Sequence, residues 1–571
     1  MNDRTYTSYS LTYKNSMPTQ KGLGRILSGA TTTSAQCLLY EDTENKVQEG
    51  LLVLIDARHG RILSRIEAII PYHEYYKVPS AWDEAIRHRS RIPEEVARKG
   101  ITAELSLLGV LTPKGLAEVS SPPNPGDEVL ALSEEGEEYE KIFGVRRESP
   151  GYIWFGTILG YDNLPIPLNV ENITMHMFNT GVTGSGKSFT AGYLIELISN
   201  IPFEEDKQKG RAALPTIIID ANEDYLDYAI SFYRGEWETA YKDLYVFVSE
   251  KSTVPIRYPL IRTEKISIDL NAFSPRELAE LVITYYSGGT LNELQVAGLE
   301  SVLKELIEEE DYLPSEIFTR HTDELYEKLE EAKSRNLIYH TTAKAIHRAV
   351  YKFCEDVVRG QKIVSDRPII SPGFIDKITE QPSLVLIDFS ADGCPMMPLG
   401  VKQLIVAYLA KLLYNKFTEY KIERKERYLM FMIEEAQNYC PNLSTYPIGY
   451  SLAREYISLI ATQGRKFGLI LCLIAQRPSF VDPIVLSMVG TFIIHRISPE
   501  DISFVRKVTG GLPKVLETKL TNLQRGTAII TGQMNSLGFP ILVKVKGRKI
   551  PHTMGKTEVM RALSRPYLKE V

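Results

Sequence analysis

The chain has 571 residues, about four times the ~150-residue unit of a typical domain, so two to four domains are expected. Apolar residues at 44% and charged residues at 24% are ordinary globular values and exclude wholesale disorder. The net charge of −6 argues against a protein covered by a nucleic-acid backbone over its whole surface. The charge is polarised, however. Residues 1–460 carry 49 basic and 66 acidic side chains, whereas residues 461–571 carry 17 basic and 6 acidic ones, so this last stretch is the first place to test for contact with phosphate.

The cysteines and the apolar runs indicate the compartment. Cys37, Cys354, Cys394, Cys440 and Cys472 are far apart and form no C-x-x-C pair, which favours neither a zinc site nor a disulfide framework. The start, MNDRTYTSYS, has no apolar signal-like region, and the longest apolar runs have the length of strands. We therefore expect a cytoplasmic protein without a membrane segment.

Short β-type runs separated by Gly and Pro fill the first part of the chain. GLGRILSG, GLLVLIDARHG, RIEAIIPY, AELSLLGVL and DEVLAL all have this character. Many short strands with turn residues between them favour a small barrel. The predicted barrel occupies residues 1–152.

The pattern then changes to apolar strands that alternate with helical segments. MHMFNTG, TIIIDA, SLVLID, YLMFMIEE, LILCLIAQ and TFIIHR are runs of the kind buried in a parallel sheet. They predict an α/β core with helices on both faces, formed by residues 153–273 and 361–537. A strand and a tail are expected over 538–571.

Residues 274–360 interrupt this core with charged, helix-periodic sequence. Ser274 and Glu277 have the spacing of a capping box, and Pro275 stands at the first helical position. We therefore expect a helical subdomain inserted into the α/β core.

The strongest local motif is GVTGSGKS at 181–188, which follows an apolar strand and opens a helix. Glycines let successive backbone amides point at phosphate oxygens, and the helix N-terminus adds its positive dipole end. Lys187 is predicted to bridge the β- and γ-phosphates of ATP, and Ser188 to ligate Mg²⁺. The predicted nucleotide-binding residues are Gly181, Thr183, Gly184, Ser185, Gly186, Lys187, Ser188 and Phe189.

Acids at the end of another strand complete the predicted hydrolysis site. Glu434 and Glu435 close the run YLMFMI. Glu434 is expected on the metal side, partly through water, and Glu435 is expected to orient and activate the attacking water. Asp220 and Asp388 also end strands, and a structural role for them is as plausible as a functional one.

Two further motifs contain candidate catalytic groups. Gln476 ends the run LILCLIA, where its amide can sense the γ-phosphate. Arg465 or Lys466, in GRKFG just before that strand, can reach a nucleotide held by an adjacent subunit. A basic helix end that complements the dipole is the simpler alternative for these cations.

GVTGSGKS, FMIEEAQNYCP, GRKFG and AQRPSFVDPIVLS, in this order, resemble the HerA family of hexameric DNA translocases, within the HerA/FtsK group of P-loop ATPases. The likeness covers most of the chain, because the β region resembles the HAS barrel of the family and 274–360 lies where the family has a helical insertion. It implies a RecA-like core, a homohexamer, ATP between subunits, and DNA drawn through a central channel. It also implies repair of double-strand breaks by end resection with a NurA-type nuclease docked on the barrel face.

By position, the resemblance makes Glu435 the catalytic glutamate, Glu434 the metal-side acid, Gln476 the sensor and Arg465 the arginine that acts across the interface. Three departures are visible. Asp220-Ala-Asn-Glu-Asp-Tyr225 replaces a DPHGEY-like segment, Gln437 stands where the family has His, and Gln463 where it has Glu. A motor of an antiviral defence complex with a different effector nuclease is the main alternative, and a nucleotide-locked scaffold is a weaker one. The residues that contact DNA are not identifiable from the sequence.

Overall fold

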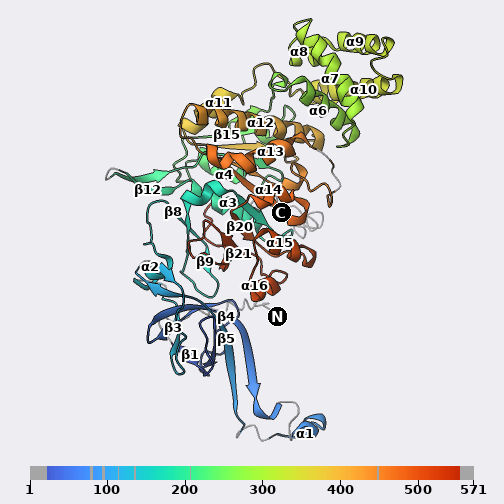
Figure 1. Cartoon of the computed structure of the whole chain (residues 1–571). Coiled ribbons are helices and arrows are strands. Elements are labelled where there is room, and N and C mark those ends of the chain that lie inside the picture. Colours follow the sequence, from blue (N-terminus) through green and yellow to red (C-terminus); the bar gives the residue numbers. More distant parts are fainter. Residues whose placement is uncertain are drawn as a thin grey trace, which may run out of the picture.

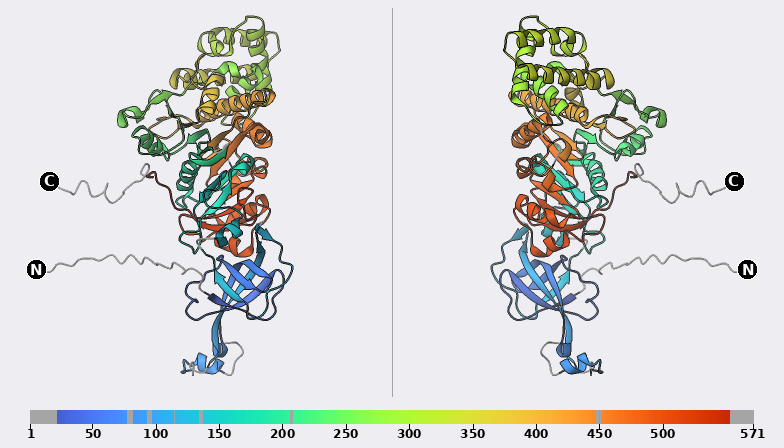
Figure 2. Two further views of the ribbon diagram at one scale, coloured as in Figure 1. Left: turned by 90° about the vertical axis from the view of Figure 1, so that its left-hand side faces the viewer. Right: turned by 90° about the vertical axis from the view of Figure 1, so that its right-hand side faces the viewer.

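The structure, a computed structural model, describes residues 22–76, 82–92, 97–113, 115–133, 137–205, 208–446, 449 and 451–552. Three tiers are stacked along the long axis of the molecule: a β-barrel, an α/β core and a helical subdomain (Figures 1 and 2). The chain forms the barrel first, enters the core, leaves it for the helical subdomain, and returns to complete the core.

A small β-barrel forms the first tier, as predicted, and the structure shows that it is closed by six strands. Strand β2 alternates exposed and buried residues, which is the period-2 pattern of a barrel wall. The order is β2-β1-β7-β3-β4-β5-β6, and the additional pairing of β2 with β5 closes the barrel. The six strands of the closed ring are β1 (Gly22–Ile26), β2 (Ser34–Leu39), β3 (Leu52–Ala57), β4 (Gly60–His73), β5 (Lys99–Thr112) and β7 (Glu128–Ala131). The short strand β6 (Gly115–Ala117) pairs with β5 outside the ring, and helix α2 (Glu137–Phe143) follows β7.

Two of these strands are much longer than the others. Strands β4 and β5 have 14 residues each and extend beyond the barrel as a two-stranded arm (Figure 1). The 3-10 turn η1 (Glu74–Tyr76) and helix α1 (Asp83–Arg87) lie at its tip. The arm therefore projects from the end of the molecule opposite the helical subdomain.

The core is one sheet of eleven strands in the order β16-β15-β17-β14-β18-β19-β11-β20-β21-β22-β9. From β16 to β20 all pairings are parallel, so these strands end at one common edge, which we call the carboxyl edge. The parallel strands are β11 (Met177–Thr180), β14 (Thr216–Asp220), β15 (Asp243–Val248), β16 (Thr263–Lys265), β17 (Ser383–Asp388), β18 (Leu429–Ile433), β19 (Leu469–Ala475) and β20 (Thr491–Ile494).

Helices cover both faces of this sheet, because alternate residues of each buried strand point to opposite sides. Ile217 and Ile219 pack into one hydrophobic cluster, and Ile218 between them packs into the other. Helices α3 (Lys187–Ile198), α4 (Leu226–Tyr233) and α5 (Val254–Arg257) pack on the Ile218 side. The other side is covered by α11 (Pro372–Glu380), α12 (Leu399–Ile422), α13 (Leu452–Gln463), α14 (Pro483–Ser487), α15 (Ile502–Val508) and α16 (Lys514–Lys519).

The helical subdomain begins with the predicted capping box. Ser274 accepts a hydrogen bond from the Glu277 backbone, and the Glu277 carboxylate accepts one from the Ser274 amide. The same carboxylate contacts Lys411 of α12 and Tyr456 of α13, which fastens the subdomain to the core. Its helices are α6 (Pro275–Ser287), α7 (Glu293–Glu308), α8 (Pro314–Thr319), α9 (Thr322–Ser334) and α10 (His340–Phe353), followed by the π-helical turn η5 (Cys354–Gly360).

The C-terminal strand is an integral part of the core. Strands β21 (Thr527–Gly532), β22 (Ile541–Lys544) and β9 (Thr157–Ile158) continue the sheet by antiparallel pairing. Two small hairpin-like pairs, β8 (Tyr152–Phe155) with β10 (Ile166–Asn169) and β12 (Ile201–Glu205) with β13 (Gln208–Ala212), flank it. The expected tail beyond His552 lies outside the described residues.

All five cysteines are buried and free. No helix within the described ranges combines the length and the apolar character needed to cross a membrane.

Candidate active site

The loop between β11 and α3 has the backbone geometry of a phosphate cradle. Gly181 and Gly186 have φ values of 154° and 118°, in the region that favours glycine. A Cβ at Gly181 would lie 2.6 Å from the Cβ of His495, so no larger residue fits there. Gly186 is the N-cap of α3, and the first amides of that helix are free of side-chain caps. The loop therefore presents the helix N-terminus to an anion.

Lys187 is the first residue of α3 and is almost fully buried. Its Nζ donates a hydrogen bond to the Val182 carbonyl at 3.3 Å. Burial lowers the pKa of Lys187, and the nearby carboxylates of Glu435 and Glu434 oppose that shift. The cation is therefore held beside the loop by negative charge at the carboxyl edge.

Glu434 follows β18 and points into the interior of the carboxyl edge. Its Oε1 accepts a hydrogen bond of 2.8 Å from the Tyr225 hydroxyl. Its Oε2 is buried and has no hydrogen-bond partner among the residues that the structure describes. Burial, together with the charge of Asp224, raises the pKa of Glu434 to about 8. A bound cation, or water on that cation, could contact this free oxygen. Either contact would supply the missing polar partner and would stabilise the ionised form of Glu434.

Glu435 is joined to the phosphate loop through Gln476. The Gln476 amide donates to Glu435 Oε1 at 2.9 Å, and its Oε1 accepts from Thr183 Oγ1 at 3.1 Å. This connection exists because β19 lies between β18 and β11 in the sheet. Gln437 donates to the second oxygen of Glu435. Glu435 itself has φ 47° and ψ 46°, a left-handed conformation that is uncommon for a non-glycine residue and is found at functional sites.

His495 packs against the phosphate loop and is hydrogen-bonded to the helix that follows it. Its Nδ1 lies 3.0 Å from the Thr527 carbonyl, so Nδ1 carries the proton and Nε2 accepts from Thr190 Oγ1 at 3.0 Å. Burial lowers the pKa of His495 to about 4, so the ring is neutral near pH 7. Through these two hydrogen bonds His495, the residue after β20, connects Thr190 of α3 to Thr527 of β21.

Phe189, a predicted nucleotide contact, lies beside the C-terminal segment. The Arg548 guanidinium stands 5.6 Å from the centre of the Phe189 ring. The amides of Lys549 and Ile550 donate to Glu196 on the same helix, at 2.7 and 2.9 Å. The segment that follows β22 is therefore anchored along α3.

Asp220 and Asp388 are paired across neighbouring strands at the carboxyl edge. Asp220 accepts hydrogen bonds from the backbone amides of Asn222, Asp224 and Tyr225, each at 3.1 Å. Burial raises the pKa of both carboxyls. By these hydrogen bonds Asp220 fixes the turn that places the Tyr225 hydroxyl next to Glu434. Asp220 therefore has a structural role.

Arg465 lies far from these groups. It belongs to the 3-10 turn η7 (Gly464–Phe467), which precedes β19, whereas Gln476 follows that strand. Seven extended residues separate the two ends by about 20 Å. Arg465 therefore lies at the opposite edge of the sheet, the amino edge, and does not belong to the phosphate loop of its own chain.

A basic cavity of about 870 Å³ opens at the amino edge. Arg427 and Lys425 pair with Glu380 and Glu423. Within the described ranges, the other cations of the cavity make no ion pair. The basic residues that line it are Lys421, Arg424, Lys425, Arg427, Arg465 and Lys466.

Three contributors to the site were not predicted as site residues: Tyr225, Gln437 and His495. Gln437 drew attention only as a departure from the HerA pattern. Tyr225 and His495 act through partners more than 200 residues away in the sequence, Glu434 and Thr190, and no local motif indicates such contacts.

Comparison with known proteins points to one family. Residues 153–413 match the family model for the central domain of helicase HerA. The DNA double-strand break repair helicase HerA of Sulfurisphaera tokodaii is 23% identical over 545 residues, which is 92% of this chain and 92% of the relative. Its counterpart from Sulfolobus acidocaldarius is 25% identical over 546 residues, with the same coverage. Among solved structures, VirB4 of Thermoanaerobacter pseudethanolicus matches with a TM-score of 0.46 and 15% identity over 71% of this chain and 98% of that one.

Proposed function

Because the chain belongs to the HerA family of helicases and is a P-loop ATPase, we propose that it is an ATP-driven DNA translocase of double-strand break repair. The observation that carries the proposal is the hydrogen-bonded connection from Thr183 through Gln476 to Glu435. It joins the phosphate loop to a strand-end carboxylate, which is what coupled binding and hydrolysis of ATP require.

In the proposed reaction the loop amides and Lys187 hold the β- and γ-phosphates. Ser188 and Glu434 would hold Mg²⁺, partly through water, and the bound ion would neutralise charge on the phosphates. The unpartnered Oε2 of Glu434 supports this assignment. Glu435 orients the attacking water and accepts its proton, while Gln476 links the state of the phosphate loop to the position of Glu435.

We further propose that the ATP site is completed by a second copy of the chain in a homohexameric ring. Arg465 is too far from its own phosphate loop, and it lines a cavity rich in cations at the amino edge. The carboxyl edge carries the carboxylates of Asp220, Asp388, Glu434 and Glu435. Head-to-tail contact between unlike edges generates a ring when the rotation closes. Arg465 would then stabilise the charge that develops on the phosphate of the neighbouring copy.

DNA would pass through the channel of that ring, and a NurA-type nuclease would dock on the barrel face to resect ends in the cytoplasm. The names of the relatives support the repair role. The barrel lies at one end of the molecule, beyond the core, which supports docking there without interference with the ATP site (Figure 2).

ATP hydrolysis by the purified full chain, measured with and without linear DNA, tests this proposal. We expect DNA to stimulate hydrolysis and the Lys187→Ala variant to be inactive in both conditions, because the variant cannot hold the phosphates. Hydrolysis that is equally fast with and without DNA would contradict the translocase assignment. Undiminished hydrolysis by Lys187→Ala would contradict the site itself.

A further inference from the structure

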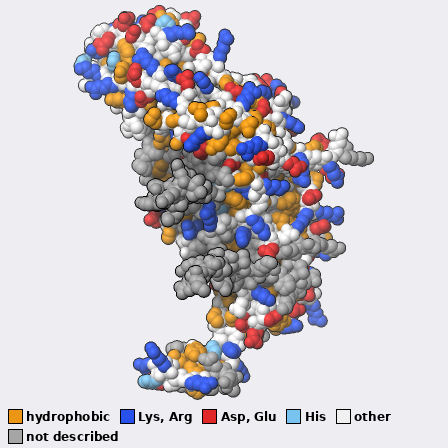
Figure 3. Space-filling model, turned by 180° about the vertical axis from the view of Figure 1, so that it is seen from behind, with side chains coloured by type: hydrophobic (Ala, Val, Ile, Leu, Met, Phe, Trp, Pro, Cys, Tyr) orange, Lys and Arg blue, Asp and Glu red, His pale blue; other side chains and the backbone are white. Residues whose placement is uncertain are grey.

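The helical subdomain is acidic, but one of its helices is not. Residues 274–360 contain 17 acidic and 10 basic side chains. Helix α10 contains three basic residues, Lys344, Arg348 and Lys352, and no acidic residue. Figure 3 shows acidic and basic side chains mixed over this end of the molecule. The composition of α10 therefore differs from that of the subdomain as a whole.

The cations of α10 form a stripe along its exposed side. Lys344, Arg348 and Lys352 follow each other at intervals of four residues, about 6 Å along the helix axis. The opposite side of the helix is buried against α6, α7 and α9 through residues such as Ile346 and Val350. The stripe therefore faces solvent. Helix α10 itself lies at the edge of the subdomain (Figure 1).

Two of these cations are unpaired. Within the part of the chain that the structure describes, the side chains of Lys344 and Arg348 make no ion pair or hydrogen bond, whereas Lys352 lies 3.1 Å from Asp356. The other cations of the subdomain are mostly paired at close range, as Lys304 is with Glu300 and Arg320 with Glu316. Unpaired cations in an acidic subdomain are available to an external anion.

Aromatic rings accompany the stripe. Tyr351 is 56% exposed and Tyr339 is 76% exposed. His347 is also exposed, and its ring stacks on Tyr326 at 4.1 Å between centres. Cations that alternate with exposed rings are typical of surfaces that follow a nucleic-acid strand, where cations meet phosphates and rings meet bases.

We propose that the exposed face of α10 binds the phosphate backbone of DNA through Lys344 and Arg348, with Tyr351 and Lys352 beside them. The inference rests on the proposed function, because it assigns a contact surface to the DNA of the translocase. Charge complementarity favours DNA over an acidic protein, since a regular row of cations one helical turn apart lets each meet a separate phosphate.

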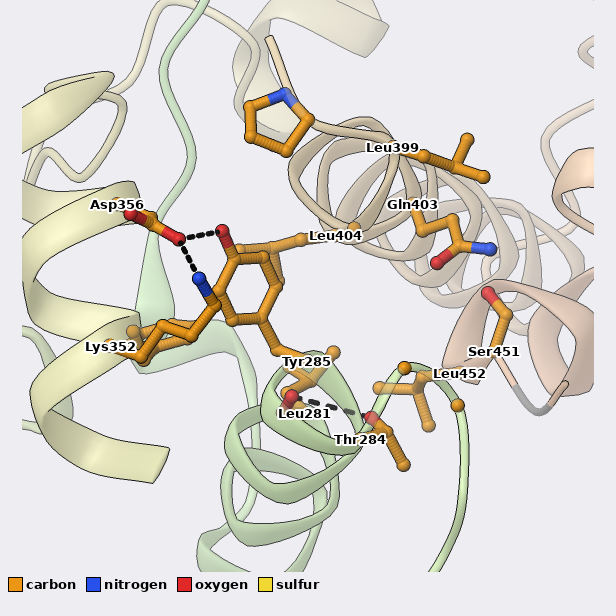
Figure 4. A pocket seen from close by; sticks show the side chains of 15 residues that line it. Leu281, Thr284, Tyr285, Lys352, Asp356, Leu399, Gln403, Leu404, Ser451 and Leu452 are labelled. Carbon is orange, nitrogen blue, oxygen red and sulfur yellow. Dashed lines mark hydrogen bonds and ion pairs between the residues drawn. The ribbon is translucent and has the colours of Figure 1, made fainter. Parts of the chain in front are cut away.

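A cavity with polar contacts on two of its walls lies between this face and the ATP site. Asp356 forms an ion pair with Lys352 and accepts a hydrogen bond of 2.7 Å from the Tyr285 hydroxyl. These groups lie at one wall of a cavity of about 410 Å³ between the subdomain and the core (Figure 4). Gln403 lies at the opposite wall and donates to the Asn438 carbonyl at 2.8 Å. Asn438 belongs to the turn η6 (Ala436–Asn438) that directly follows Glu435. The cavity therefore lies between the α10 face and the turn that follows Glu435.

The double variant Lys344→Gln/Arg348→Gln tests the inference in the full chain. DNA affinity is measured by fluorescence anisotropy with labelled linear DNA over a series of salt concentrations. We expect weaker binding and a slope of log K against log salt that is smaller by about 1 to 2, because two phosphate contacts are lost. Hydrolysis without DNA should equal that of the unaltered protein, while DNA stimulation should need more DNA.

Matched variants distinguish the α10 face from general charge effects. Lys304→Gln/Arg320→Gln removes two positive charges from the same subdomain and should keep the original slope. Lys344→Arg/Arg348→Lys preserves both charges and should keep DNA affinity. If the α10 double variant binds DNA with the unaltered affinity and slope, the inference is wrong even though the unaltered protein is stimulated by DNA. If the unaltered protein is not stimulated by DNA, the proposed function itself fails.

Discussion

The two edges of the core sheet differ in their charged groups, because carboxylates gather at one and cations at the other. The carboxyl edge holds the phosphate loop and the carboxylates of Glu434 and Glu435, and the amino edge holds the cavity lined by Arg424, Arg465 and Lys466. The parallel strands separate these groups by about the length of a strand, so Arg465 and the phosphate loop of one copy lie at opposite edges of the sheet. The difference teaches that the predicted catalytic residues belong to two surfaces, which we propose meet only between copies.

Removing the cation of the amino edge should have the largest effect. Arg465→Ala is expected to slow hydrolysis by about 1000-fold or more while ATP still binds, because an arginine supplied across an interface stabilises charge only in the transition state. Steady-state hydrolysis and equilibrium nucleotide binding measure the two quantities. Lys466→Ala, in the same cavity, is the matched control and should retain most activity. Equal losses in both variants would mean that the cavity contributes only general positive charge.

Removing the acid of the carboxyl edge should have the next largest effect. Glu435→Gln keeps the shape of the side chain but cannot accept a proton, so hydrolysis should fall by about 100-fold or more. Nucleotide affinity should be preserved, which distinguishes this variant from Lys187→Ala. A Glu435→Gln protein with undiminished turnover would remove Glu435 from the mechanism.

The amides that hold Glu435 should matter less. Gln476→Ala breaks both the bond to Glu435 and the bond to Thr183, and we expect a loss of up to about 100-fold in kcat. Gln437→Ala breaks only the bond to Glu435 and should cost about tenfold. Both variants should leave KM for ATP nearly unchanged. A larger loss for Gln437→Ala than for Gln476→Ala would mean that the connection to the phosphate loop is unimportant.

The smallest effect concerns stability and pH. His495 has a pKa of about 4 in the fold and an ordinary pKa near 6.5 when unfolded, so below pH 6.5 the unfolded chain binds the additional proton. Stability from the neutral ring is complete above pH 6.5 and falls by about 2 kcal/mol between pH 6.5 and 5. His495→Gln should flatten this part of the dependence of the thermal midpoint on pH. Parallel curves for the two proteins would contradict a neutral buried ring.

Local patterns predicted much of the fold. Apolar strands of the core, the short strands of the barrel and the capping box at Ser274 follow from spacing within short stretches, because side-chain period and end groups are local properties. Closure of the barrel by β2 and β5, and the union of β9 with β22 in the core sheet, depend on pairing between distant segments. The length of the arm formed by β4 and β5 also could not be predicted from any local sequence pattern.

In the candidate site, too, local motifs predict some residues, whereas other residues are recognisable only from contacts between distant segments. GVTGSGKS and the Glu434-Glu435 pair are local motifs and could be predicted as site residues, although their catalytic roles remain proposals. The hydrogen bonds of Gln476 depend on the strand order β18-β19-β11, and the support from Tyr225 and His495 depends on contacts across the sheet. Such long-range contacts are set by packing of the whole domain and leave no pattern in a single segment.

Mixed assemblies of two inactive variants test the shared ATP site most directly. Lys187→Ala and Arg465→Ala chains with different tags are co-expressed, and assemblies that contain both are isolated by tandem purification. At equal mixing, about a quarter of the interfaces join an intact phosphate loop to an intact Arg465 of the neighbouring copy, so hydrolysis should reappear. If mixed assemblies are as inactive as each variant alone, the two edges do not form one site and the account is wrong.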